Sequence, residues 1–316
     1  MKNRLYVGPK QTTIENTDFF DGSITLVGDN TNNNKAFKNV LPFDYWNPDN
    51  NHLEIDIYNR EIAKLTQLTE IMAHNPRLVS HCVFPDNVLQ ICKNSNSLLE
   101  IVDNKNQTRA LLKNVIPMLN YQIIKGSEFN YQILRNVSDD LVVQHPIGSG
   151  GSKTFLCNQY NHEQVKSVLI PYEYYSISAY QFDNVPYNIH CVVGADQIVI
   201  FTPSKQEIAV SNILEYIGND FDIHIPPEVK SKLAEYSTEV CKKLQIMGYR
   251  GVLGIDYIHV DSELYFIEIN PRFQGSTRQV DGLLKKSRLP SIFDYNYRAF
   301  IGKEMPNSRK MEKGIE

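Results

Sequence analysis

The sequence predicts an α/β module in its first hundred residues, followed by a longer part built from paired strands and helices. Two observations carry this prediction. Strand and helix patterns alternate as far as Asp103, and two later pairs of apolar strands are joined by short polar or glycine-rich segments. The chain has 316 residues, of which 42% are hydrophobic and 22% charged, an ordinary globular composition. This length suits two or three modules around one site.

The N-terminal module is predicted from four short patterns. Residues 24–28 have the pattern of a buried strand, and apolar residues at helical spacing over 62–72 predict a helix that ends at Pro76. Residues 78–83 predict a second strand, and Pro85 suits the first turn of a second helix. This alternation of strands and helices predicts the α/β class.

The remaining chain is predicted to contain two main helices and two hairpins. One helix covers residues 105–114, and a long amphipathic helix runs from Pro227 to a stop at Gly248. Apolar strand patterns occur over residues 141–143, 155–157, 187–193, 197–202, 251–260 and 264–270. The first two of these strands predict one hairpin, and the last two predict another.

Charge, apolar runs and cysteines argue against several classes of protein. A protein that grips a phosphate backbone is normally basic, so the net charge of −4 argues against a nucleic-acid partner. No apolar run approaches the ~20 residues that span a bilayer, and no apolar segment of a secretory signal follows the first ten residues. The five cysteines are scattered without a C-x-x-C pair, which suits a reducing compartment. We therefore expect a cytoplasmic protein with no membrane partner.

A glycine-rich segment lies between the strands of the first hairpin. It consists of Gly148, Ser149, Gly150, Gly151, Ser152, Lys153 and Thr154. It is not a Walker A loop, because that motif needs glycine where Ile147 and Ser152 stand and must open a helix. Two interpretations remain open: a flexible flap whose backbone N–H groups and Lys153 meet a polyphosphate, or an ordinary hairpin turn.

The second hairpin carries the strongest functional signal. Because side chains alternate along a strand, Glu268 and Asn270 share one face. A three-residue loop over 261–263 would pair Val260 with Leu264 and Asp256 with Glu268. Two buried carboxylates repel unless a cation lies between them, and hard oxygen ligands suit Mg²⁺, with Mn²⁺ as an alternative.

Two further features border this hairpin. Arg272 follows it, where a guanidinium would stabilise negative charge or pair with Asp256 or Glu268. The alternative interpretation of the whole hairpin is a solvated polar face. Asn188, His190 and Gln206 lie on or beside neighbouring predicted strands, and Arg278 is a candidate carboxylate anchor.

From Lys105 to Ile301 the chain resembles the ATP-grasp superfamily, and within it a carboxylate–amine ligase. The resemblance implies that Asp256, Glu268 and Asn270 hold Mg²⁺ and that Arg272 meets substrate or acyl-phosphate. It also implies that Lys105 and the glycine-rich segment contact the nucleotide. The linker residues that meet adenine and ribose would be Ile170, Tyr172 and Glu173. Gln144 stands where the family usually has a second phosphate-binding lysine, and we hypothesise that Lys153 compensates for its missing charge.

The resemblance also implies an organisation and an activity. Residues 1–103 would form the N-terminal α/β module, 104–172 a small α+β subdomain, and 173–316 a large α+β subdomain. The implied enzyme uses ATP to join a small carboxylate to an amine, amino acids among the candidates. Other ATP-grasp chemistry (a carboxylase or an acid–thiol ligase), a carrier-protein or peptide substrate, and a non-catalytic ATP-binding module are the alternatives. The sequence leaves both a monomer and a homodimer open.

Overall fold

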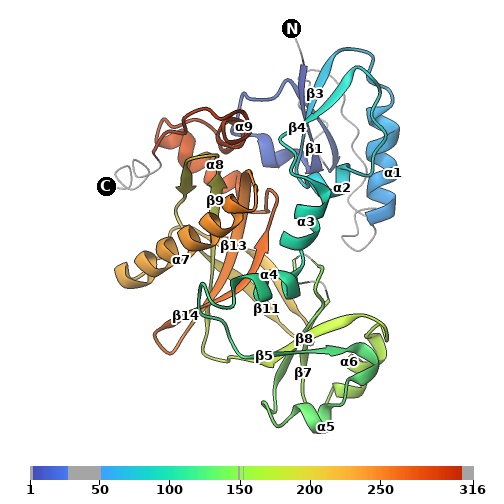
Figure 1. Ribbon diagram of the computed structural model, residues 1–316, viewed down its shortest axis with the longest axis vertical. Helices are drawn as coiled ribbons and strands as arrows, with labels where there is room; N and C mark the ends of the chain where they lie inside the picture. The colour runs from blue at the N-terminus through green and yellow to red at the C-terminus, as the bar shows by residue number, and fades with distance from the viewer. Residues whose placement is uncertain (1–2, 28–50, 149, 152, 308–316) are drawn as a thin grey trace.

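The computed structural model describes residues 3–27, 51–148, 150, 151 and 153–307. Its elements form three sheets that occupy different parts of the molecule (Figure 1). The N-terminal sheet lies at the upper right of that view and the small sheet at the bottom. The largest sheet lies between them, with the C-terminal helices above it.

The N-terminal sheet is parallel and has the strand order β2-β1-β3-β4. Its elements are β1 (Asn3–Lys10), a 3-10 helix η1 (Gln11–Ile14), β2 (Gly22–Val27), α1 (Asn51–Ile62), β3 (Thr69–Ala73), α2 (Pro76–Val79), β4 (Val88–Ile91) and α3 (Asn96–Val102). The predicted α/β class and the strand near residues 24–28 are confirmed.

Three predictions within this module are wrong. The helix predicted over 62–72 ends at Ile62, and Thr69–Ala73 is a buried central strand instead. Pro76 begins a helix rather than ending one, because Asn75 accepts hydrogen bonds from the next backbone N–H groups and Pro76 occupies the first turn. Residues 78–83 therefore form no strand, and a turn at Pro85 leads into β4 instead of a helix.

The small sheet is antiparallel, with the order β5-β8-β6-β7. Its elements, with the helix that leads into it, are α4 (Lys105–Leu112), β5 (Tyr121–Lys125), the 3-10 helix η3 (Gly126–Glu128), α5 (Tyr131–Leu134), β6 (Leu141–Gln144), β7 (Thr154–Cys157), α6 (His162–Val168) and β8 (Tyr174–Ala179). The hairpin predicted around the glycine-rich segment is present, with Gln144 opposite Thr154. The division at 172/173 stays a prediction, and β8 on its far side pairs with β5 and β6.

The large sheet is built from antiparallel pairs in the order β12-β11-β9-β13-β14, with β10 paired to β9. Its strands are β9 (Val185–Val193), β10 (Ile198–Ile200), β11 (Ser204–Val210), β12 (Leu214–Asp220), β13 (Gly251–Val260) and β14 (Glu263–Asn270). Its helices are α7 (Pro227–Ile246), α8 (Thr277–Lys286) and α9 (Ile292–Ile301). The predicted long helix is α7, and Gly248 follows it at φ +89°, a conformation that favours glycine.

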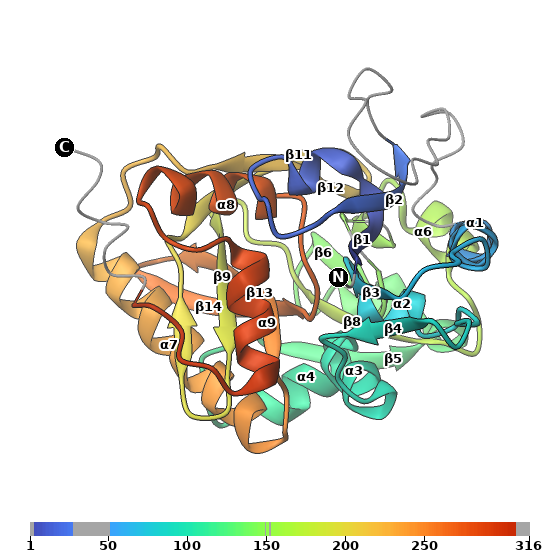
Figure 2. The ribbon, with the colours of Figure 1, turned by 90° about the horizontal axis from the view of Figure 1, so that it is seen from above.

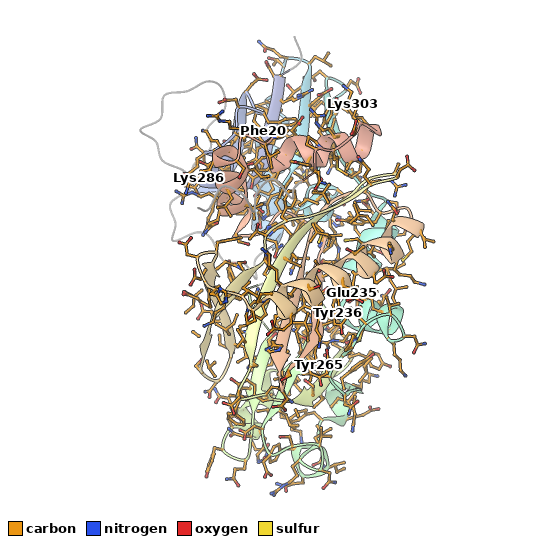
Figure 3. The ribbon with its side chains drawn as sticks, turned by 90° about the vertical axis from the view of Figure 1, so that its left-hand side faces the viewer. Phe20, Glu235, Tyr236, Tyr265, Lys286 and Lys303 are labelled. Carbon is orange, nitrogen blue, oxygen red and sulfur yellow. The ribbon has the colours of Figure 1, made fainter. Side chains whose placement is uncertain are left out.

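The two faces of the large sheet differ in a way that positions the site. One face is apolar, and α7 packs along it (Figure 3). On the other face, Val192 and Val252 lie in the core formed with α8 and α9, which cross one end of the sheet (Figure 2). Farther along the same face the residues become polar, at Asn188 and Asp256. The core formed with α8 and α9 therefore does not include the part of this face that carries Asn188 and Asp256.

Within the described residues, no helix is long and apolar enough to cross a membrane.

Candidate active site

The carboxylate hairpin places its acidic residues opposite each other. Asp256 on β13 pairs with Glu268 on β14, and Gly254 pairs with Asn270. The predicted three-residue loop is wrong, because Asp261 and Ser262 alone make the turn, at φ +49° and +67°. A bulge between Asp256 and Tyr257 absorbs the difference in register, so that the expected carboxylate pairing is still formed.

Amide side chains surround Asp256 and hold its two oxygens. Asn188 Nδ2 donates to Asp256 Oδ1 at 2.6 Å, and Gln206 Nε2 donates to the same oxygen at 3.2 Å. Asn270 Nδ2 donates to Asp256 Oδ2 at 3.0 Å and to Glu268 Oε1 at 3.4 Å. The structure thus brings Asn188 and Gln206 to the carboxylate pair, as their positions on neighbouring strands suggested.

Burial and mutual repulsion separate the two carboxyl groups in acidity. Burial, together with the charge of Glu268, raises the pKa of Asp256 to about 7. Burial also acts to raise the pKa of Glu268, but the charges of Lys105 and Arg272 outweigh it and lower that pKa below its ordinary value. Asp256 therefore keeps a proton that Glu268 gives up, and a divalent cation could replace that proton.

The donor set fits a hard cation. Two carboxylates and an amide oxygen are ligands that Mg²⁺ accepts, usually together with phosphate oxygens and water. Asn270 here presents Nδ2 to both carboxylates and Oδ1 to Arg272, so its oxygen would face the ion only if the amide group turned over. One buried oxygen close by, Asn188 Oδ1, has no hydrogen-bond partner among the described residues. No group of three His, Cys, Asp or Glu side chains in the described part of the chain could hold a metal, so further ligands would come from amides, phosphates and water.

Arg272 extends this site without forming a salt bridge within it. Its Nη2 donates to Asn270 Oδ1 at 2.8 Å, which orients the amide. Its charge also lowers the pKa of Glu268. The alternative of a salt bridge from Arg272 to Asp256 or Glu268 is wrong, since neither pair comes within ion-pair distance.

Lys105 connects the carboxylates to the glycine-rich segment. Its Nζ lies 3.2 Å from Glu268 Oε2 and donates to Gly148 O at 3.1 Å. The side chain is buried, and the residue begins α4, where Asn104 accepts hydrogen bonds from the first backbone N–H groups. Lys105 therefore lies between Glu268 of the large sheet and the glycine-rich segment of the small sheet.

The glycine-rich segment packs against the edge of the large sheet. Gly150 and Gly151 have φ +62° and +83°, and Tyr216 N donates to Gly150 O at 3.2 Å. A Cβ on Gly151 would lie 1.7 Å from Leu214 O, so this close approach requires glycine. Lys153 is exposed with φ +61°. Ser149 and Ser152 lie outside the described residues.

The predicted adenine linker lies at the entry to β8. Glu173 O accepts a hydrogen bond from Gly126 N at 2.8 Å, and Ile170 O accepts one from Glu173 N at 3.1 Å. Glu173 Oε2 is 3.9 Å from His145 Nε2, and the Tyr172 side chain is exposed. Glu173 is thus near His145, the residue that follows Gln144, and the contact of Ile170, Tyr172 and Glu173 with a nucleotide stays a prediction.

Two residues near the site, Arg109 and His74, were not predicted from the sequence. Arg109, four residues after Lys105 on α4, donates to the Gln144 side chain, and only this helical spacing could have drawn attention to it. His74, beyond the end of β3, is partly buried and bonded to the Tyr6 hydroxyl at 2.8 Å, while its backbone carbonyl accepts from Phe273 N at 3.1 Å. Burial and the charge of Arg272 lower the pKa of His74 to about 3. The N-terminal module therefore borders the candidate site.

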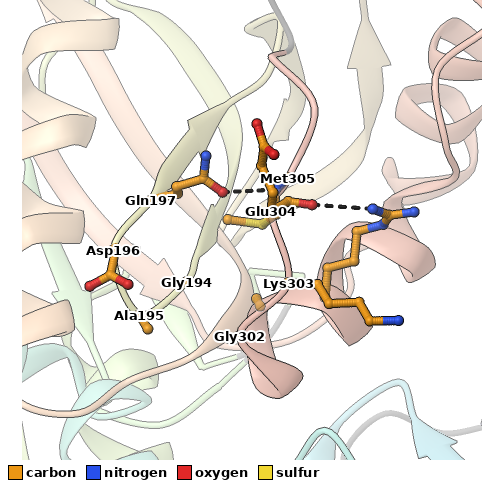
Figure 4. Close-up of a pocket in the computed structure, with 10 residues that line it drawn as sticks. Gly194, Ala195, Asp196, Gln197, Gly302, Lys303, Glu304 and Met305 are labelled. Carbon is orange, nitrogen blue, oxygen red and sulfur yellow. Dashed lines mark hydrogen bonds between the residues drawn. The ribbon is translucent and has the colours of Figure 1, made fainter.

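Two other features lie apart from these residues. Arg278, the candidate carboxylate anchor, forms a salt bridge with Glu15, the residue that follows η1. A cavity of about 220 Å³ lies between the turn after β9 and the end of α9 and contains none of the predicted site residues (Figure 4). There Gln197 Oε1 accepts from Met305 N, and Arg298 donates to Glu304 O.

The family assignment rests on a sequence match over the site-bearing part of the chain. The family model described as an ATP-grasp domain matches residues 102–276, more than half of the chain. The match includes Lys105, the glycine-rich segment and the carboxylate hairpin. The chain therefore belongs to the ATP-grasp family, and the predicted fold class is confirmed.

Curated relatives share only part of their length with this chain. The carbamoyl phosphate synthase large chain of Clostridium acetobutylicum is 22% identical over 225 residues, which are 65% of this chain and 19% of that protein. The same-named protein of Clostridium botulinum is 32% identical over 108 residues, which are 32% of this chain and 10% of that one. This chain thus spans about a fifth of the first relative's length or less.

Solved structures resemble nearly the whole chain. A phosphoribosylamine–glycine ligase of Thermotoga maritima matches with a TM-score of 0.66 and 11% identity, over 97% of this chain and 77% of that one. An L-amino acid ligase of Bacillus licheniformis matches with a TM-score of 0.64 and 13% identity, over 100% of this chain and 77% of that one. A carboxyaminoimidazole ribonucleotide synthase of Aspergillus clavatus, solved with ATP, matches with a TM-score of 0.63 and 14% identity, over 97% of this chain and 78% of that one. At these identities the likeness shows the fold.

Proposed function

We propose that this protein is an ATP-dependent ligase that forms an amide bond between a small carboxylate and an amine through an acyl-phosphate. The observation that carries the proposal is the pair of facing carboxyl groups, Asp256 and Glu268, connected through Lys105 to the glycine-rich segment of the other sheet. Solved ligases of the same fold, two of which are named for joining an amino acid, support this choice.

Asp256, Glu268 and Asn270 would hold Mg²⁺, or Mn²⁺ on the same ligands. When bound, the ion would supply positive charge that offsets the negative charge of the phosphates. The remaining charge at the phosphates is offset by Lys105, by Lys153 on the loop and by Arg272 at the end of the hairpin. Backbone N–H groups of Gly148, Gly150 and Gly151 would contact the phosphates, and Ser149 and Ser152, which lie outside the described residues, are further candidates from the sequence.

The nucleotide lies between the small and the large sheets. Ile170, Tyr172 and Glu173 flank adenine and ribose, and Gln144 faces the phosphates. This arrangement follows the three-part division into residues 1–103, 104–172 and 173–316, in which the N-terminal module borders the substrate side through His74 and Phe273.

The reaction has two balanced steps. A carboxylate oxygen attacks the γ-phosphorus, the bond from that phosphorus to the β–γ bridging oxygen breaks, and ADP leaves. The amine nitrogen then attacks the acyl carbon, the bond from that carbon to the phosphate oxygen breaks, and phosphate and a proton leave. Arg272 and Lys105 stabilise charge during transfer, and the glycine-rich segment limits access of water to the acyl-phosphate.

The test is release of ADP and phosphate from Mg-ATP across a panel of amino acids and other small carboxylates, each alone and then in pairs with amines. We expect one carboxylate to stimulate release and one amine to increase it further, with an amide detected by mass spectrometry. Stimulation only by bicarbonate, a thiol or a carrier protein would replace the proposal with another ATP-grasp chemistry. ATP binding without stimulation by any panel member or carrier would favour a non-catalytic module.

A further inference from the structure

The position before the glycine-rich segment is occupied by a buried but uncharged side chain. Gln144 ends β6, and its neighbours Leu141 and Val143 face the core of the small subdomain. Gln144 therefore points to the opposite face, where its cross-strand partner is Ser176 of β8. A neutral amide on this face cannot by itself offset a polyphosphate charge.

Arg109 reaches the same face from α4 and holds both residues. One guanidinium nitrogen, Nη2, donates to Gln144 Oε1 at 2.6 Å and to Ile267 O of β14 at 3.3 Å. The other, Nη1, donates to Ser176 Oγ at 2.5 Å. Because Gln144 Oε1 accepts from Arg109, the amide nitrogen Nε2 points away from it, and the structure gives Nε2 no acceptor among the described residues.

The charge of Arg109 is not neutralised by a close carboxylate. Lys105 uses its ammonium group on Glu268, and Lys153 is exposed on the loop. No Asp or Glu in the described ranges lies within ion-pair distance of the Arg109 guanidinium, and Glu268 acts on it only over a longer distance. A partly buried cation that contacts both the small and the large sheets would be stabilised by an anion bound beside it.

We propose that Arg109 is a positioning residue for the nucleotide: it fixes Gln144 so that the amide N–H groups donate to the polyphosphate, and its own charge replaces the one that Gln144 lacks. This inference rests on the proposed function, because it assigns a role at the same nucleotide site. It differs from the hypothesis that Lys153 supplies the missing charge, since Arg109 bonds Gln144 directly.

The competing interpretation is that Arg109 only connects the two sheets. A connecting role would affect the stability of the protein and would weaken the binding of ATP, ADP and adenosine alike. A role toward the polyphosphate would affect ATP and ADP but not adenosine, and a cation placed at residue 144 would restore it.

The experiment measures the dissociation constants of Mg-ATP, ADP and adenosine by calorimetry for the parent, Arg109→Met, Gln144→Met and the double variant Arg109→Met/Gln144→Lys. The matched control is Arg135→Met, which removes an Arg whose exposed side chain pairs with Asp139. Thermal melts identify any variant that does not fold. If Arg109→Met is unfolded, Gln144→Met still tests whether the Gln144 amide donates to the polyphosphate, because this variant leaves Arg109 in place.

We expect Arg109→Met to raise the Kd for ATP and ADP by about tenfold to a hundredfold, the size of one charge-assisted hydrogen bond. Gln144→Met should raise the Kd values for ATP and ADP by a smaller factor. The Kd for adenosine should not change in any variant, and the double variant should regain most of the ATP affinity. Unchanged ATP affinity in folded Arg109→Met, or equal losses for adenosine and ATP without rescue, overturns the inference alone. A parent protein that binds no ATP overturns the proposed function as well.

Discussion

At the scale of single residues, the site depends on two carboxyl groups, and ionising both of them costs free energy. Burial raises the pKa of Asp256 to about 7, while the charges of Lys105 and Arg272 lower the pKa of Glu268 and keep that group ionised. Such a pair is costly unless a cation or proton lies between its members. The same burial that makes the pair costly would favour a divalent ion between the two carboxylates, which is the proposed metal site.

Exchanging either carboxylate for its amide should therefore separate function from folding. Glu268→Gln and Asp256→Asn are each expected to abolish ATP turnover, by about a hundredfold or more, because each removes one ligand charge at the phosphates. Phosphate release and thermal melts measure the two properties. Full activity in either folded variant would refute the metal assignment. Glu215→Gln, at an acidic residue on β12 outside the carboxylate hairpin, is the matched control.

At the scale of elements, α8 and α9 are connected by one buried carboxylate. Asp281 Oδ1 accepts from Ile292 N, the first backbone N–H of α9, at 2.9 Å. Its Oδ2 is buried without a partner among the described residues, and burial raises the pKa of Asp281 to about 6. An ionised Asp281 thus costs folding free energy.

This cost predicts a pH dependence with a defined sign. The folded state binds the Asp281 proton more tightly than the unfolded state, so stability falls as pH rises from about 4 to 6 and is level above that range. Asp281→Asn keeps the acceptor but removes the charge. Its free energy of unfolding relative to the parent should rise by about 2–3 kcal/mol between pH 4 and pH 8. Denaturant unfolding at several pH values measures this, and a pH-independent difference would contradict it.

Elements also explain which sequence predictions succeeded. The strands of the carboxylate hairpin, the glycine-rich hairpin and α7 were predictable, because long periodic patterns and turn residues agree there. The N-terminal helix and strand assignments failed over residues 62–85. Short apolar runs fit both periods in that region, and Asn75 turned Pro76 from a helix end into a helix start.

At the scale of the whole molecule, one aromatic cluster connects the N-terminal sheet, the site and the C-terminal helices. The ring of Phe293 on α9 lies 6.2 Å from Tyr6, 5.0 Å from Phe20 and 4.7 Å from Phe273, measured between centroids. Phe273 directly follows Arg272. The packing of the N-terminal module therefore influences where Arg272 lies.

Removing the centre of this cluster should destabilise the protein and impair the site. We expect Phe293→Ala to lower the free energy of unfolding by about 3–5 kcal/mol, as for other buried phenylalanines. Phe182→Ala, the same change at a side chain that is 67% exposed, should lower it by less than about 0.5 kcal/mol. Equal effects in denaturant unfolding would show that the cluster does not connect these parts.

The sequence by itself determined the candidate ligand types and the strands that carry them, because the alternation of side chains along a strand depends on neighbouring residues only. It led to Asp256, Glu268, Asn270, Lys105 and the glycine-rich segment. Only the tertiary structure decided which side chains from distant elements meet them: Asn188 and Gln206 at Asp256, Arg109 at Gln144, and His74 beside Phe273. These contacts join residues far apart in the chain through the packing of three sheets, and no local pattern encodes that packing.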